Sequence, residues 1–163
     1  MEDGATYRRV TSRILQVCSA LNASEARYLV IGGAACVLHG YVRATTDVDI
    51  LIEPTRENAE RVLEALSTVG FGFARELTAM EILAAPITVI GDNPAVDIFL
   101  GAWSINYRTA LPGSTRVDVE GVSVPLVGID DLIASKESGR PQDVADVEAL
   151  RQVKRLRAER GEG

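Results

Sequence analysis

Three aspartates in two apolar segments are the residues of this chain best suited to chemistry. Asp47 and Asp49 lie one residue apart in the run DVDILI, and Asp97 lies inside a second apolar run, AVDIFL. Side chains alternate along a β-strand, so Asp47 and Asp49 are expected on one face. Neighbouring carboxylates repel each other, and a divalent cation with oxygen ligands relieves that repulsion. With Asp97 on an adjacent strand, three carboxylates suffice for two magnesium ions about 3.5–4 Å apart.

Each acid also has an interpretation without function. An acidic pair is common at the solvated end of a strand, and Asp97 follows the turn sequence Gly91-Asp92-Asn93-Pro94, which makes it a candidate turn residue. The residues ILI after the pair favour a central, buried strand instead. Burying two carboxylates is costly unless they are paired or bind a metal, so we favour the metal site.

A glycine pair upstream supplies a candidate phosphate site. Gly32-Gly33 follows a short apolar strand and opens a helix. A backbone without Cβ atoms can approach a phosphate closely, and helix N-termini favour anions. A simple tight turn is the alternative, and the acidic pair downstream favours the phosphate interpretation.

Two cations are candidates for contacts with a nucleotide. Lys136 lies in an otherwise apolar helix, where it either reaches a phosphate or is a solvated head on a buried stem. Arg43 shortly precedes the acids and either neutralises them or contacts the nucleotide or acceptor. Arg140 is expected to pair with Asp143 or Asp146, one helical turn apart.

Three more side chains are expected to be structural. His39, the only histidine, has no visible partner and suits packing or a helix end. Trp103 and Tyr107 follow the third acid, where stacking on a base or sugar is conceivable, but core packing is the favoured interpretation.

Composition limits the class of protein. A length of 163 residues and 47% hydrophobic content predict one domain over residues 1–163, with a core at about 25–127 and a C-terminal helical part at about 128–158. A net charge of −6 argues against a broad basic face for nucleic acid. No apolar run approaches the ~20 residues that span a bilayer, and the first residues lack a signal-peptide core, so a cytoplasmic protein without a membrane partner is expected.

The hydrophobic pattern predicts an α/β (α+β) chain with a small mixed sheet and flanking helices. Helices are expected at residues 6–22, 34–41, 55–69, 77–83, 129–138 and 141–157, and a loop or short helix at 103–110. Strands are expected at residues 28–31, 47–53, 87–90 and 95–100, with a hairpin at 115–120 and 122–126.

Together these segments resemble the nucleotidyltransferase superfamily, which has the DNA polymerase β-like fold. The likeness runs from about residue 25 to 150 and rests on GGAA, RATTDVDILI, AVDIFL and DLIASKESGRPQDVADVEAL. It is greatest for small bacterial members related to AbiEii-type and MenA-type toxins. The resemblance implies a mixed sheet that bears metal-binding acids, and transfer of a nucleoside monophosphate from a triphosphate with release of pyrophosphate.

The resemblance also implies roles for single residues. Asp47 and Asp49 match the metal-binding pair, and Asp97 matches the third carboxylate, which activates the acceptor hydroxyl. Gly32 and Gly33 match the phosphate-binding turn, although many relatives have glycine-serine there. Lys136 resembles a lysine directed to the triphosphate, and the implied cofactors are two Mg²⁺ ions with an NTP as substrate.

Several functions remain open from the sequence. The acceptor is RNA, such as a tRNA end in the toxin-like relatives, or a small hydroxyl compound such as an aminoglycoside or lincosamide, or a protein hydroxyl. A toxin-like protein would also have a cognate antitoxin as partner. The alternative class is a non-catalytic nucleotide- or partner-binding module, which the three retained aspartates argue against.

Overall fold

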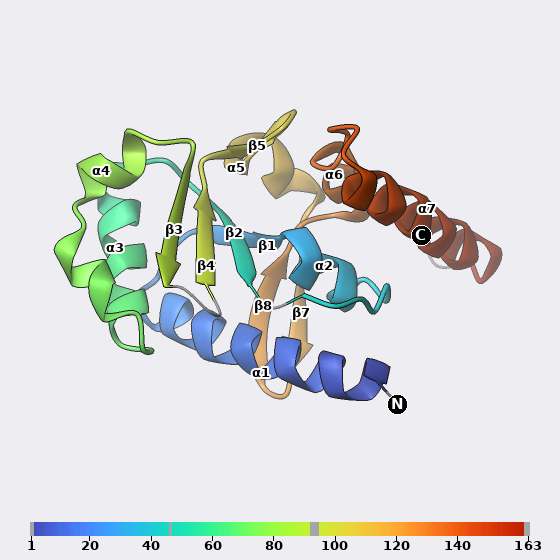
Figure 1. Ribbon diagram of the computed structural model, residues 1–163, viewed down its shortest axis with the longest axis horizontal. Coiled ribbons are helices and arrows are strands. Elements are labelled where there is room, and N and C mark those ends of the chain that lie inside the picture. Colours follow the sequence, from blue (N-terminus) through green and yellow to red (C-terminus); the bar gives the residue numbers. More distant parts are fainter. Residues whose placement is uncertain (1, 46, 92–94, 162–163) are drawn as a thin grey trace.

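The computed structural model describes residues 2–45, 47–91 and 95–161, with side chains from Ser12 onward. Its main sheet has six strands in the order β3-β4-β2-β1-β8-β7, with helices around it (Figure 1). The strands are β1 (Tyr28–Ile31), β2 (Val48–Ile52), β3 (Ile87–Gly91), β4 (Ala95–Phe99), β7 (Thr115–Val119) and β8 (Val122–Leu126), and a separate two-stranded ribbon contains β5 (Gly101–Ala102) and β6 (Ile105–Asn106). This arrangement confirms the predicted mixed α/β fold class.

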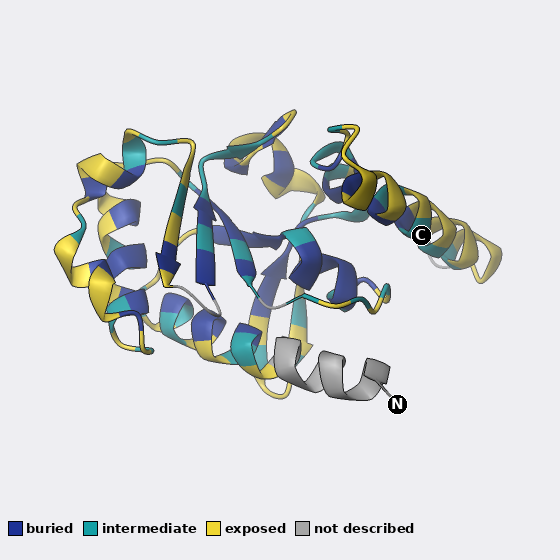
Figure 2. Ribbon diagram, viewed as in Figure 1, coloured by how far each residue is buried: buried dark blue, intermediate teal, exposed yellow. Residues whose placement is uncertain are grey.

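The centre of the sheet is formed by the most apolar strands. Strand β2 pairs antiparallel with β1 on one side and parallel with β4 on the other. Figure 2 shows these three strands largely buried, with the edge strands more exposed. Their Val, Ile and Leu side chains suit a sheet covered by helices. The two acidic segments are therefore adjacent in the middle of the sheet.

The helices surround this sheet in two groups. Helices α1 (Glu2–Ala23) and α3 (Arg56–Ser67) contact each other, and α4 (Ala79–Leu83) and a 3₁₀ helix, η1 (Gly72–Glu76), pack on α3. Helix α2 (Gly32–Leu38) contacts β1, β2 and α6 (Ile129–Ala134), which contacts α7 (Pro141–Glu159). The remaining elements are α5 (Tyr107–Ala110) and η2 (Leu111–Gly113). Helix α7 lies at the opposite end of the molecule from α3 and α4 (Figure 1).

Local chemistry explains several helix starts. The Thr55 side chain accepts a hydrogen bond from the Asn58 amide and caps α3. Thr78 and Glu81 form a capping box at α4. Pro141 occupies the first turn of α7, where its missing N–H costs nothing.

Several predicted boundaries were wrong. Helix α2 begins at Gly32, because both glycines enter the helix, and it ends at Leu38. Helix α6 ends at Ala134, and α4 is preceded by a 3₁₀ helix instead of starting at Leu77. Most of the predicted turn Gly91–Pro94 lies outside the described residues. Within the described part of the chain, no helix combines the length and apolar character needed to cross a bilayer.

Candidate active site

A cavity of about 580 Å³ brings the predicted site residues together. The sheet contributes three carboxylates, and the region between α6 and α7 contributes basic side chains and Asp143. The seven residues that the sequence assigned to the metal or the nucleotide all line it: Gly32, Gly33, Arg43, Asp47, Asp49, Asp97 and Lys136. Acidic and basic groups thus line the same open cavity.

The register of the sheet pairs two of the acids. Asp49 on β2 lies directly opposite Asp97 on β4, and the two carboxyl groups are within hydrogen-bonding reach. Asp47 immediately precedes β2, and its Oδ1 accepts a hydrogen bond of 3.0 Å from the Ala95 amide at the start of β4. The prediction that Asp97 lies beside the other two aspartates is therefore confirmed.

Burial and mutual repulsion perturb the titration of this pair. Burial, then the charge of Asp97, raise the pKa of Asp49 from 3.8 to about 7, while Lys136 lowers it. Burial also raises the pKa of Asp97, although the hydrogen bond with Asp49 acts in the opposite direction. Burial and mutual repulsion therefore make it costly for both carboxyl groups to be ionised at the same time.

The carboxylate oxygens at this site are the type of ligand that a hard divalent cation prefers. Asp97 Oδ1 is buried and, among the described residues, has no hydrogen-bond partner, which is an expensive state for a carboxylate oxygen. A cation beside it would satisfy that oxygen and let both members of the pair ionise. As they stand, however, no three His, Cys, Asp or Glu side chains in the described part of the chain are grouped closely enough to hold a metal ion.

The side chains around the glycine pair leave no room for a Cβ at either position. Gly32 has φ +68, and a Cβ there would overlap Asp49 Oδ2. A Cβ on Gly33 would lie 2.6 Å from Thr45 Oγ1 and 2.9 Å from Arg43 Nη1. The serine that many superfamily relatives carry at the second position would therefore be crowded here. The predicted phosphate role of the pair stays a prediction, and room for Asp49 is a separate reason for glycine at position 32.

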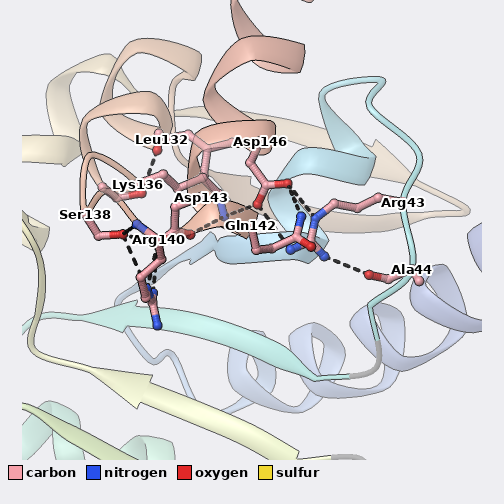
Figure 3. Close-up of polar contacts among 10 residues, drawn as sticks. Arg43, Ala44, Leu132, Lys136, Ser138, Arg140, Gln142, Asp143 and Asp146 are labelled. Atoms are coloured by element: carbon pink, nitrogen blue, oxygen red, sulfur yellow. Dashed lines mark hydrogen bonds and ion pairs between the residues drawn. The ribbon is translucent and has the colours of Figure 1, made fainter.

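Asp146, which the sequence analysis did not place in the site, organises the basic side of the cavity (Figure 3). Its side chain is fully buried and accepts hydrogen bonds from Arg43 Nε at 2.9 Å and Lys136 Nζ at 2.8 Å. Gln142 Nε2 donates another at 2.9 Å. Burial alone would raise the pKa of Asp146, but these donors more than offset it and hold the pKa below its usual value.

These contacts correct two expectations and confirm a third. Lys136 is buried, so the solvated-head alternative was wrong. Arg43 pairs with Asp146 instead of neutralising the aspartates beside it in sequence. Arg140 pairs with Asp143 at 2.9 Å, as one of its two predicted partners. A spacing of three residues in DVAD was the available signal for Asp146, but it was assigned to Arg140.

The aromatic residues near the third acid differ from each other. Tyr107 is buried as expected, whereas Trp103 is 69% exposed and has φ +57, so core packing was wrong for Trp103. It lies in the turn between β5 and β6, next to Ala102 in the cavity wall. His39 ends α2 as predicted: its Nε2 lies 2.7 Å from the Val127 carbonyl oxygen, and its Nδ1 lies 3.1 Å from Arg157 Nη2.

The chain belongs to the family described as nucleotidyltransferase of unknown function (DUF6036), whose model matches residues 5–160. No curated protein matches the chain. The toxin-like subgroup stays a prediction.

Two solved structures are similar in fold. An antigenic nucleotidyltransferase-like protein from Paracoccidioides brasiliensis has a TM-score of 0.58 at 15% identity, over 88% of this chain and 75% of that chain. A candidate nucleotidyltransferase from Thermotoga maritima has a TM-score of 0.49 at 14% identity, over 90% of this chain and 89% of that chain. At 15% identity, the first structure supports the fold of this chain and nothing further.

Proposed function

We propose that this protein is a Mg²⁺-dependent nucleotidyltransferase that moves a nucleoside monophosphate from an NTP to a hydroxyl acceptor. The observation that carries the proposal is the polarity of the cavity, with Asp47, Asp49 and Asp97 on the sheet side and Lys136 and Arg43 facing them. A metal-bound triphosphate has the matching polarity, because its cation seeks carboxylates and its remaining phosphate charge seeks basic groups.

The three aspartates are the residues that would hold the metal. Bound magnesium would lower the pKa of the acceptor hydroxyl and stabilise the charge that develops on the α-phosphate. Asp97 accepts the hydroxyl proton while the hydroxyl oxygen forms a bond to the α-phosphorus. The bond from the α-phosphorus to the bridging oxygen breaks, and pyrophosphate leaves with the electron pair. Lys136 and Arg43 bind the β- and γ-phosphates.

RNA is the acceptor class that we propose. A groove of about 590 Å³ shares Lys136 with the cavity and continues along α7; its lining contains Glu137 and Glu148 as well as the basic Lys136, Arg151 and Arg155. Such basic side chains suit the phosphates of a polynucleotide. A cationic small hydroxyl compound is the second candidate, and the net charge of −6 favours it.

The experiment is incubation of the purified protein with each labelled NTP and Mg²⁺, together with total tRNA or a panel of aminoglycosides and lincosamides. Label in RNA supports the proposal, label in a small compound replaces the acceptor class, and no transfer combined with no Mg-NTP binding favours a non-catalytic module. Asp49→Ala should abolish transfer in a folded protein. Asp130→Ala, which removes a 74% exposed carboxylate, is the control that should retain it.

A further inference from the structure

We infer that Asp146 is a positioning residue that fixes Lys136 and Arg43 at the places where they bind the triphosphate. This inference rests on the proposed function and deepens it, because it assigns a role to a buried carboxylate that faces no substrate in that proposal. The unusual feature is a single carboxylate, 0% exposed, that receives two cations from different parts of the chain. Arg43 lies in the loop before β2, and Lys136 lies between α6 and α7.

The geometry at Arg43 fixes its whole guanidinium plane. Its Nε donates to Asp146 Oδ1 at 2.9 Å, and its Nη2 donates to Oδ2 at 3.1 Å, in a bidentate pair. Its Nη1 donates to the Ala44 carbonyl at 2.7 Å. Paired on two sides, the guanidinium has little rotational freedom, which reduces the entropy lost when it binds a phosphate.

The geometry at Lys136 is similarly constrained. Its Nζ donates to Asp146 Oδ2 at 2.8 Å and lies 3.9 Å from Asp143 Oδ1. Lys136 also lowers the pKa of Asp49 through its charge, so its ammonium influences the acidic side of the cavity. An ammonium group has three N–H donors. One donor of Lys136 is bound to Asp146, and the residue also lines the cavity.

A pure charge effect and a positioning role predict opposite changes in polyanion affinity when Asp146 is replaced by a neutral residue. Asp146→Asn removes one negative charge next to the cavity, so charge alone would make the protein bind a polyanion more tightly. If Asp146 instead holds the two cations in place, the same variant binds the polyanion more weakly, because both cations lose their fixed positions. The sign of the change therefore tests the inference.

The experiment is calorimetric titration with Mg²⁺-tripolyphosphate, the part shared by all NTPs, into the wild type and Asp146→Asn. We expect about tenfold weaker binding by the variant, while the thermal shift caused by Mg²⁺ alone is unchanged because the metal-binding aspartates are intact. A purely structural role for Asp146 would weaken both responses. Asp130→Asn is the matched control, since its 2.7 Å pair with Lys154 also joins α6 to α7 but is exposed. It should bind tripolyphosphate like the wild type.

Equal or tighter tripolyphosphate binding by folded Asp146→Asn overturns the inference and leaves the proposed function standing. If the wild type binds no Mg²⁺-tripolyphosphate and no NTP, the proposed function fails and the inference fails with it. Loss of a partner in a buried ion pair can prevent folding, so Asp146→Glu is the second variant. It keeps the charge but displaces the carboxylate by one methylene. It should weaken tripolyphosphate binding, and unchanged affinity overturns the inference.

Discussion

Asp49 and Asp97 occupy matched positions on the parallel strands β2 and β4, with their carboxyl groups in hydrogen-bonding reach across the pair. The close approach follows from strand register, because residues opposite each other on neighbouring strands have their side chains on the same face. Two distant parts of the chain thus deliver acids to one point. The remaining repulsion between them has measurable consequences.

In the metal-free protein, we expect the contribution of the Asp49–Asp97 pair to stability to fall as pH rises from about 4 towards about 7. Asp49 has a folded pKa of about 7 against an ordinary 3.8, so in that range the folded state binds more protons than the unfolded state. Stability therefore falls with rising pH. Added Mg²⁺ should raise the melting temperature more at about pH 8 than at about pH 5, because it competes with a proton at low pH. Scanning fluorimetry at the two pH values measures this difference.

Asp49→Asn provides the control for that behaviour. Without the charge, the metal-free variant should be more stable than the wild type at about pH 8, and Mg²⁺ should shift its melting temperature little. A variant that is less stable at this pH, or a wild-type Mg²⁺ shift that does not depend on pH, would contradict the described pair.

Gly32→Ala should disrupt the site more than an ordinary glycine replacement. The new methyl group would overlap Asp49 Oδ2 in addition to straining a backbone with φ +68. Gly121→Ala is the control, since that glycine has φ +85 and open space around its α-carbon. Backbone strain of about 1–2 kcal/mol applies to both variants. Urea unfolding should show a larger loss for Gly32→Ala, and only this variant should lose its Mg²⁺ response.

His39 should make the protein sensitive to acid. Burial lowers the pKa of His39 below 6.5, and the charge of Arg157 lowers it further, while the Val127 carbonyl acts in the opposite direction. The unfolded chain then binds the extra proton first, so stability is lost as pH falls below the unfolded pKa. His39→Gln has no titrating ring. We expect the wild type to lose more unfolding free energy than this variant between about pH 7 and pH 5, and parallel pH profiles would refute it.

Trp103 should be more easily replaced by glycine than by alanine. Its φ of +57 is unfavourable for any side chain with a Cβ, and its exposed ring has little packing to lose. Trp103→Gly relieves the strain, whereas Trp103→Ala keeps it. The glycine variant should be the more stable of the two by about 1–2 kcal/mol in urea unfolding. Equal stabilities would mean that the turn relaxes without strain.

Most elements could be predicted because their signals are local. Strands β1, β2 and β4 are short apolar runs bounded by glycine, proline or acidic residues, and Thr55 and Pro141 are ordinary helix starts. The two-stranded ribbon at β5 and β6 escaped prediction, because two-residue strands have no periodicity. Its strained tryptophan occupies a position where sequence rules would place glycine.

The acidic part of the site could be predicted because aspartates inside apolar strands have few roles other than binding a cation or pairing with a basic group. Three aspartates in apolar runs required a partner, and the cavity brings them together. The position of Asp146 could not be deduced, because an acid in a charged helix is typical of a solvated face. Only the packing of α7 against the rest of the molecule makes that carboxylate buried and surrounds it with Arg43, Lys136 and Gln142.

The bond between the loop before β2 and the last helix has a consequence for biosynthesis. Arg43 leaves the ribosome 103 residues before Asp146, so the two can pair only after the start of helix α7 has been made. A nascent chain can therefore assemble its carboxylate face while its basic face is still incomplete. If the proposed function holds, competence to bind a nucleotide should appear only when helix α7 docks.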